Sequence, residues 1–248
     1  MAKAVRATRA TVPASTRGKR SPLANRRVSA DERRARLAVV ETTQIMSAIG
    51  LSPGRSGNVS CRFDTGMLIT PSGMAYDTLT PDDMVFVDAD GSVPQGARKP
   101  SSEWQFHLAA LKRRPDRHAV VHTHSRHALI LACRHEPIPA FHYMVAAAGG
   151  VDIPCVPYAI FGSAELSDHV ANGLTERDAC LMANHGMTAI GETLDAALEL
   201  ARDVEELAAQ YIGVLQLGKP KRLNAKQMAE VLERFKGYGQ RAQTAEAS

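Results

Sequence analysis

Two histidines one residue apart end an apolar run in the stretch AVVHTHSRH, residues 119–127. The β-branched residues of this run predict a strand, and side chains at positions i and i+2 of a strand project from the same face. His122 and His124 could therefore bind the same transition-metal ion. Taken alone, a His-x-His pair is more often a pair of hydrogen-bonded histidines, because a metal site needs more than two ligands.

Two further residues could complete a metal-ligand set. His185 lies in the turn NHG between two apolar segments, and Glu103 lies in the first turn of a predicted helix that begins with two serines. Three imidazole nitrogens and one carboxylate would fill the four-coordinate shell of zinc. The other histidines are expected to be surface, packing or supporting residues, with His127 as the best substitute for one of the three ligands.

Three short loops could bind an oxyanion. They are SGNVS (56–60), TPSG (70–73) and PSSE (100–103), and all precede the histidine pair. Such loops expose backbone N–H groups and hydroxyls, and serines at a helix N-terminus add the favourable end of the helix dipole. Each loop alone is more often an ordinary turn or helix cap. Because Glu103 directly follows the serines of the third loop, one helix end could hold a phosphate beside a metal ion.

The elements that must position these residues mix helices and strands without strict alternation. Leu37, Val40 and Ile45 have near-helical spacing, and Ser101 or Ser102 is the expected N-cap of the second helix. Helices are expected at 31–49, 100–115, 128–135, 163–174, 192–217 and 225–236, and extended segments in NVSCRF, MLIT, MVFVD, AVVHTHS, IPCVPYAIF and ACLMANHGMTAIG. This order favours a three-layer α/β/α single domain with a mainly antiparallel central sheet.

Charge is distributed unevenly along the 248 residues. Eight of the 30 Lys and Arg residues lie in residues 1–30, which hold no acidic residue, so residues 31–248 carry 22 basic and 26 acidic side chains. We expect residues 1–29 to be a disordered basic tail and residues 30–243 to be the folded domain. A mildly acidic domain argues against nucleic-acid binding, which needs positive charge on the folded surface.

Composition also bears on the cellular compartment. Cys61, Cys133, Cys155 and Cys180 form no C-x-x-C pair, as expected of reduced structural thiols. No apolar run approaches the roughly 20 residues that a membrane span needs. The Arg-rich start overlaps with organelle transit peptides but lacks the apolar centre of a secretory signal. We therefore expect a cytoplasmic protein that does not enter a membrane.

Assembled in order, these segments resemble the class II aldolase/epimerase (adducin-like) family, and within it the L-fuculose-1-phosphate aldolase branch. The matching stretches run from Gly57 to Arg241, about three quarters of the chain, and are GNVSCRF, LITPSGMAYDTL, PSSEWQFHLA, VVHTHS, PAFHYMVAAAGG, IPCVPYAIFGSAELSDHV, NHG and FKGYGQR. The resemblance implies Zn²⁺ held by His122, His124, His185 and a movable Glu103. It implies a phosphate site of Gly57, Asn58, Ser72, Gly73, Ser101 and Ser102.

The resemblance also implies a reaction and an assembly. A zinc-dependent lyase of carbohydrate metabolism would cleave a ketose 1-phosphate to dihydroxyacetone phosphate and an aldehyde, with zinc stabilising the charge of the enediolate. Glu103 would move protons at the enediolate carbon and Tyr143, from an adjacent subunit, at the C4 oxygen. Tyr238 would close over the substrate and Phe161 would line the aldehyde pocket. Shared sites imply a homotetramer.

Several alternatives stay open at the level of sequence. The aldehyde could be lactaldehyde or the product of a 5-deoxy- or 5-methylthio-pentulose 1-phosphate. The related L-ribulose-5-phosphate 4-epimerases have a similar pattern but with Asp at the position of Glu103. Sugar-acid phosphate decarboxylases share the fold. The adducin head is a non-catalytic interaction module that resembles the fold but lacks the zinc ligands. Arg55 stands where the aldolases usually have threonine, and could add a phosphate contact or point to solvent.

Overall fold

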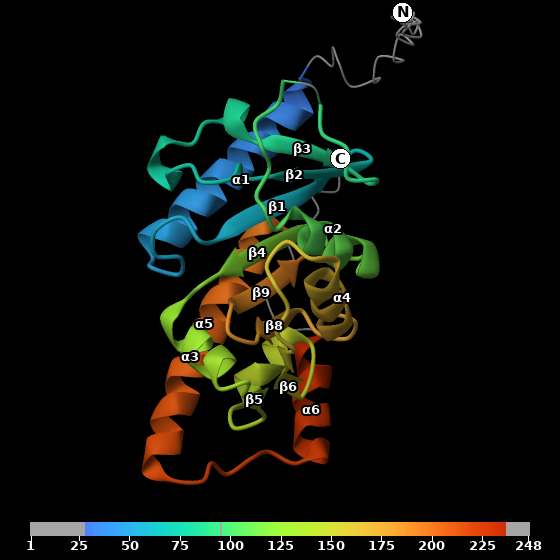
Figure 1. The fold of residues 1–248 in the computed structure, drawn as a ribbon. Coiled ribbons are helices and arrows are strands. Elements are labelled where there is room, and N and C mark those ends of the chain that lie inside the picture. The colour runs from blue at the N-terminus through green and yellow to red at the C-terminus, as the bar shows by residue number, and fades with distance from the viewer. Residues whose placement is uncertain (1–27, 95, 237–248) are drawn as a thin grey trace, which may run out of the picture.

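A seven-stranded sheet organises the computed structural model, which describes residues 28–94 and 96–236 (Figure 1). Its strand order is β3-β2-β1-β4-β9-β8-β7, and every neighbouring pair is antiparallel except β7 with β8. The strands are β1 (Asn58–Phe63), β2 (Gly66–Ile69), β3 (Val85–Asp88), β4 (Ala119–Thr123), β7 (Cys155–Val156), β8 (Ala179–Met182) and β9 (Gly186–Gly191). The predicted mainly antiparallel sheet is confirmed.

Helices cover both faces of this sheet (Figure 1). The helices are α1 (Ala30–Ala48), α2 (Trp104–Arg113), α3 (Arg126–Cys133), α4 (Ala164–Gly173), α5 (Leu194–Leu217) and α6 (Ala225–Phe235). Alternation along β4 separates the two cores: Val121 packs with α1, α3 and α5, whereas Val120 packs with α2 and α4. The predicted three layers follow from this two-residue periodicity.

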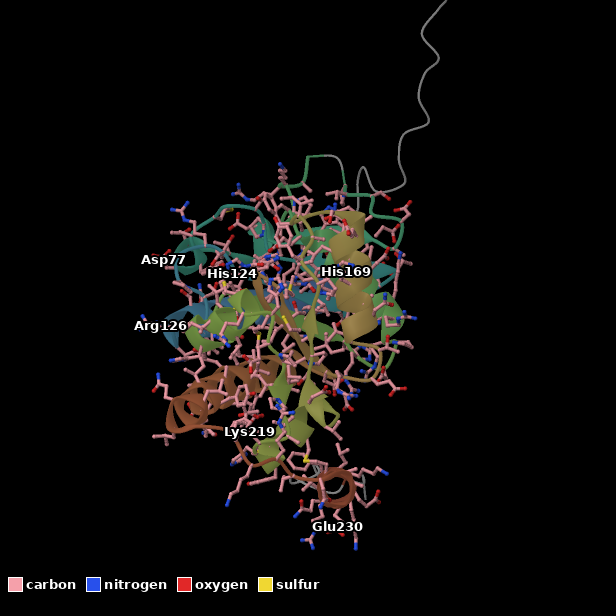
Figure 2. The ribbon with its side chains drawn as sticks, turned by 60° about the horizontal axis from the view of Figure 1, so that its bottom comes forward. Asp77, His124, Arg126, His169, Lys219 and Glu230 are labelled. Atoms are coloured by element: carbon pink, nitrogen blue, oxygen red, sulfur yellow. The ribbon has the colours of Figure 1, made fainter. Side chains whose placement is uncertain are left out.

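Smaller elements complete the chain. A two-stranded sheet pairs β5 (Ile138–Pro139) with β6 (Asp152–Ile153), and the short helices are η2 (Tyr76–Thr78), η3 (Pro81–Asp83) and η4 (Tyr143–Ala148). Met228 of α6 is buried against Ala140 and Ala146, so the C-terminal helix packs beside η4. Lys219 and Glu230 lie at the end of the molecule remote from His124 (Figure 2).

Four details differ from the sequence predictions. Helix α2 begins at Trp104 with Glu103 as its N-cap, so neither Ser101 nor Ser102 is the cap. Strand β4 ends at Thr123, one residue before His124. Residues 153–161 were expected to be extended as a whole, but only Ile153 and the two residues of β7 are in strands.

The fourth difference concerns the packed face of α1. Leu37 and Ile45 are 44% and 49% exposed, because Val39, Val40 and Met46 take the face toward the sheet. Ser29 caps this helix by accepting a hydrogen bond from the backbone N–H of Glu32 at 3.1 Å. No helix of the described residues is long and apolar enough to span a membrane. The predicted tail (1–29), apart from its last two residues, and the end of the predicted domain (237–243) lie outside the described residues.

Candidate metal centre

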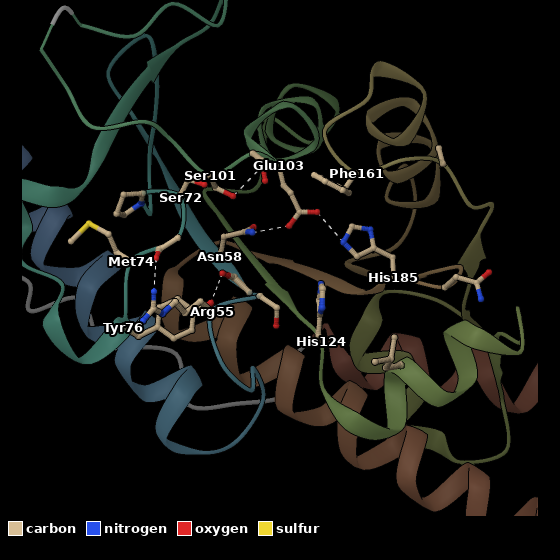
Figure 3. A pocket seen from close by; sticks show the side chains of 18 of the residues that line it. Arg55, Asn58, Ser72, Met74, Tyr76, Ser101, Glu103, His124, Phe161 and His185 are labelled. Atoms are coloured by element: carbon tan, nitrogen blue, oxygen red, sulfur yellow. Dashed lines mark hydrogen bonds and ion pairs between the residues drawn. The ribbon is translucent and has the colours of Figure 1, made fainter.

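The four predicted metal ligands converge at one point. Glu103, His122, His124 and His185 each offer a ligand atom, and these atoms all lie within 4.8 Å of one another. Figure 3 shows three of these residues, Glu103, His124 and His185, side by side. The Nε2 atoms of His122 and His124 are 3.0 Å apart. The Glu103 carboxylate reaches His185 Nε2 at 2.9 Å through Oε1 and His122 Nε2 at 3.3 Å through Oε2. The cluster thus joins the α2 N-cap, the end of β4 and the β8–β9 turn.

Backbone geometry at the β8–β9 turn places His185 opposite the histidine pair. Asn184 has a φ of 54°, a left-handed conformation that asparagine tolerates better than most residues. A Cβ atom at Gly186 would lie 2.5 Å from the Thr123 carbonyl oxygen and 2.9 Å from His124 Cδ2. The sequence NHG therefore permits a tight turn and a close approach of β9 to the end of β4.

A hydrogen bond to the backbone directs the lone pair of His122 into the cluster. His122 Nδ1 donates to the Met187 carbonyl oxygen at 2.9 Å, so in the neutral ring Nε2 carries the lone pair that faces His124. Within the described chain, the buried Oε1 atom of Glu103 makes no hydrogen bond, although it lies 2.9 Å from His185 Nε2. Imidazole nitrogens and carboxylate oxygens that converge in this way are the donor set that a divalent cation requires.

Electrostatics favour the metal-binding protonation states. Burial raises the pKa of Glu103, but the neighbouring His122 and His185 outweigh it and hold that pKa well below its usual range. Burial, followed by His122 and His185, lowers the pKa of His124 to about 3. At neutral pH the site therefore presents a carboxylate and a neutral His124, the forms in which these groups bind metals.

The cluster lies in the wall of a cavity of about 590 Å³. His124, His185 and Glu103 line it, while His122 is fully buried behind them. The predicted phosphate and aldehyde residues share the same cavity: Gly57, Asn58, Ser72, Gly73, Ser101, Ser102 and Phe161. Segments distant in the sequence are thus brought together around one cavity.

Three other predicted or candidate residues are not among the described residues that line this cavity. Tyr143, in η4, is 50% exposed and is not among the residues that line this cavity. Tyr238 lies outside the described residues. His127, the substitute ligand, pairs instead with Glu205, whose Oε1 lies 2.8 Å from His127 Nδ1.

The sequence analysis missed several residues of the cavity. Tyr76 is buried and donates a hydrogen bond to the Gly57 carbonyl oxygen, which fixes the loop before Asn58. Burial raises the pKa of this tyrosine despite hydrogen bonds to Ser52 and Gly57. Other unpredicted lining residues are Met74, Leu129, Cys133, Tyr158 and Asn184. Met74 and Tyr76 lie within the motif LITPSGMAYDTL, Tyr158 within IPCVPYAIFGSAELSDHV and Asn184 within NHG, whereas Leu129 and Cys133 lie outside the matching stretches.

Arg55 lines the cavity on the side of the serine-rich loops. Its Nη1 donates to the Gly73 carbonyl oxygen at 2.9 Å and so joins the loop at 55–58 to the loop at 70–73 (Figure 3). Among the described residues that line this cavity it is the only Arg or Lys. One end of the cavity therefore offers a positive charge beside hydroxyls and backbone N–H groups.

Comparison with known proteins identifies a matching family and several similar enzymes. Residues 37–212 match the family described as "Class II Aldolase and Adducin N-terminal domain". A 5-methylthioribulose-1-phosphate/5-deoxyribulose-1-phosphate aldolase of Rhodospirillum rubrum is 51% identical over 208 residues, covering 84% of this chain and 94% of the relative. An L-fuculose phosphate aldolase of Escherichia coli is 48% identical over 204 residues, covering 82% and 94%. A solved L-fuculose 1-phosphate aldolase has a TM-score of 0.79 at 36% identity, covering 84% and 97%.

Proposed function

The chain belongs to the class II aldolase and adducin family, and on that premise we propose that it cleaves a ketose 1-phosphate to dihydroxyacetone phosphate and an aldehyde. The observation that carries this proposal is the convergence of three imidazoles and a carboxylate in the wall of one cavity with serine-rich loops. A metal site and an anion site so close together suit a substrate whose phosphate lies next to the bond that breaks.

The proposed metal is Zn²⁺, for which three histidines and a carboxylate are typical ligands. His122, His124, His185 and Glu103 would hold it. The ion would act as a Lewis acid that stabilises the negative charge developing on the substrate oxygens during carbon–carbon bond cleavage. Imidazoles that already converge suit this role because they need little rearrangement to bind the ion.

The loops of the cavity would bind and orient the substrate. Ser72, Gly73, Ser101 and Ser102, with the segment Gly57–Asn58, would hold the phosphate, supported by their shared position in the cavity wall. Arg55 would add a positive charge at the same end. The arrangement would leave the carbon chain extended past Glu103 toward Phe161, which would line the aldehyde pocket.

Proton transfer completes the proposed reaction. In the cleavage direction the C4 hydroxyl loses its proton, the C3–C4 bond breaks, and C4 becomes the aldehyde carbon. The electron pair stays on the C3 side, where Glu103, after taking up a proton from solvent, would deliver that proton to C3 to give dihydroxyacetone phosphate. Tyr143 of an adjacent copy would take the C4 hydroxyl proton, and Tyr238 would cover the substrate.

A homotetramer with active sites between copies is proposed because Tyr143 would reach the site of an adjacent copy. Phe161 is 61% exposed and Tyr143 50% exposed in one chain, so both are available to a second copy. Light scattering of the purified protein tests this assembly. A fully active monomer would contradict it. The expected cytoplasmic location stays a prediction, which imaging of a tagged chain would test.

A panel of ketose 1-phosphates tests the reaction and the aldehyde together. The panel contains L-fuculose, L-rhamnulose, 5-deoxyribulose and 5-methylthioribulose 1-phosphates, with L-ribulose 5-phosphate as the epimerase control. We expect equal amounts of dihydroxyacetone phosphate and aldehyde from at least one ketose 1-phosphate, and one metal ion per chain. Metal-loaded protein that releases no dihydroxyacetone phosphate, or only epimerises the pentose, would refute the proposal.

A further inference from the structure

A row of buried polar side chains extends from the metal cluster into the space between β1 and α2. Asn58 Nδ2 donates to Glu103 Oε2 at 2.9 Å. The other amide atom, Asn58 Oδ1, faces His107 Nε2, and His107 Nδ1 lies 2.7 Å from Ser60 Oγ. Asn58 is 4% exposed, while His107 and Ser60 are fully buried. The proposed reaction gives no role to His107 or Ser60.

The chemistry of these groups fixes the direction of each hydrogen bond. An amide oxygen can only accept, so His107 Nε2 must carry the proton in its contact with Asn58 Oδ1. In the neutral ring, Nδ1 then accepts from the Ser60 hydroxyl. If the Asn58 amide were turned over, its oxygen would face the Glu103 carboxylate and its NH₂ group would face the N–H of His107. The observed orientation is therefore the one in which every contact has a donor and an acceptor.

This row bears on Glu103 because few other groups orient its carboxylate. Although Glu103 is the N-cap of α2, its side chain makes no capping hydrogen bond. Among the described residues, its carboxylate contacts His122, His185 and Asn58. The two histidines belong to the metal-ligand set, and a bound ion would take their lone pairs. Among the described contacts, the Asn58 amide then remains as the hydrogen-bond donor that sets the angle of the carboxylate.

We propose that His107 and Ser60 are positioning residues, which fix the amide orientation of Asn58 and thereby hold the Glu103 carboxylate in place for metal binding and proton transfer. The effect on turnover rests on the proposed function, whereas the hydrogen-bond directions do not. Groups behind metal ligands commonly change metal affinity or activity by about 10- to 100-fold when they are replaced. Burial makes the arrangement rigid, because an unpaired polar group there would be costly.

Nitrogen NMR tests the hydrogen-bond directions without any substrate. ¹⁵N-labelled full-length protein, with and without zinc, should show His107 as the neutral Nε2–H tautomer. Replacement of His107 by Gln identifies its signals, because they disappear in that variant. An Nδ1–H tautomer would overturn the proposal, since His107 Nε2 could then not donate to Asn58.

Matched variants test the consequence for the carboxylate. His107→Leu removes both hydrogen bonds, whereas His107→Gln keeps an N–H donor near the position of Nε2. We expect His107→Leu to lower kcat about 10- to 100-fold with little change in KM, and to alter the visible spectrum of the Co²⁺-loaded protein. His107→Gln should restore most of both, and Ser60→Ala should lower kcat by about tenfold or less.

Thr43→Val controls for the loss of a buried hydrogen bond. Thr43 is fully buried in α1 and donates to the Val39 carbonyl oxygen at 2.7 Å, outside the cavity. This variant should lose thermal stability but keep kcat and the Co²⁺ spectrum. Should His107→Leu and His107→Gln lower kcat equally and leave the Co²⁺ spectrum unchanged, the effect is one of packing against Phe106 and the proposal is wrong.

The two proposals fail in different ways. A wild-type protein that cleaves no ketose 1-phosphate refutes the proposed function, while the His107 tautomer and the Co²⁺ spectra still decide the positioning role. A wild-type protein that turns over, with a His107→Leu variant identical in kcat and spectrum, refutes the positioning role alone.

Discussion

The metal cluster and the segment that carries Tyr143 differ in how much of their surroundings one chain supplies. His122 is fully buried and Glu103 is 6% exposed, and both are held by hydrogen bonds or ion pairs within the chain. Tyr143 lies in the short helix η4 with half of its surface exposed, and does not line the cavity. The metal cluster is formed by residues of one chain. The Tyr143 side chain, in contrast, is exposed and does not line the cavity of that chain.

This difference separates two tasks of the proposed enzyme. The core can build the metal centre because β4, β9 and α2 are fixed by the central sheet. Packing of Ala146 in η4 against Met228 in α6 holds the backbone of the Tyr143 segment. The Tyr143 side chain nevertheless stays half exposed to solvent. A single folded chain should therefore bind metal, whereas catalysis should require Tyr143 from a second copy.

The largest effect is expected when one of the proposed metal ligands is removed. Replacing His124 by Ala should abolish stoichiometric zinc binding and lower kcat/KM by more than about a thousandfold, because metal catalysis supplies several kcal/mol. Metal analysis and the aldolase assay measure the two effects. His118→Ala is the control, since this exposed histidine lies outside the cluster and should leave both unchanged. A His124→Ala protein with full metal content would contradict the assigned ligand set.

Glu103 separates holding the metal from moving the proton. Glu103→Gln keeps an oxygen ligand but cannot accept or return a proton, so kcat should fall by about 100- to 10,000-fold while zinc is retained. Steady-state kinetics with metal analysis of the same sample test this outcome. Retained turnover would show that the base lies elsewhere in the cavity.

Sequence predicted the metal cluster well because its signals are local. Strand alternation placed His122 and His124 on one face, and the turn NHG marked His185. The exact role of Glu103 was less accessible: its position at the N-cap, rather than in the first turn of α2, depends on how the preceding loop packs. Similarly, helical spacing named Leu37 and Ile45 in α1, but the sheet determines which apolar face of a helix is buried.

The supporting residues could not be predicted from spacing. Ser60 and His107 are 47 residues apart, and their contact arises because β1 and α2 meet beside the cluster. Before the fold is known, a histidine in the middle of WQFHLA is indistinguishable from an ordinary packed residue. The proposed action of Tyr143 would also depend on a second copy, so spacing within one chain could not reveal it.

Mixed assemblies test whether Tyr143 acts across copies. Tyr143→Phe should lower kcat by about 100-fold or more, since it removes the proposed proton acceptor. Coexpressed Tyr143→Phe and Glu103→Gln chains should regain activity, because some sites would combine an intact Glu103 with an intact Tyr143 from the neighbour. Equal, random mixing predicts about a quarter of wild-type sites. Activity no higher than that of either parent would place Tyr143 in its own chain's site, and so remove the contrast between the two regions.

Arg55 tests the phosphate end of the cavity with a smaller effect. Arg55→Thr should raise KM about tenfold and weaken competitive inhibition by inorganic phosphate to the same extent, because a charge-assisted hydrogen bond contributes roughly 1.5–3 kcal/mol. The effect should shrink at high salt. Arg33→Thr, at an exposed position of α1, removes the same charge outside the cavity and should change neither value. Unchanged phosphate inhibition in Arg55→Thr would show that the guanidinium only joins the two loops.

The smallest effect is expected at the N-terminus, where removal of residues 1–28 should leave kcat, KM and the midpoint of thermal unfolding unchanged. This deletion keeps Ser29, whose hydroxyl accepts the hydrogen bond from Glu32 N–H at the start of α1. Ser29→Ala in the shortened chain should cost about 1 kcal/mol of stability without altering kcat, because it removes the cap but no residue of the cavity. Neither the core-built metal centre nor the Tyr143 segment should depend on residues 1–28, so an inactive or insoluble deletion would mean that the tail belongs to one of these two regions.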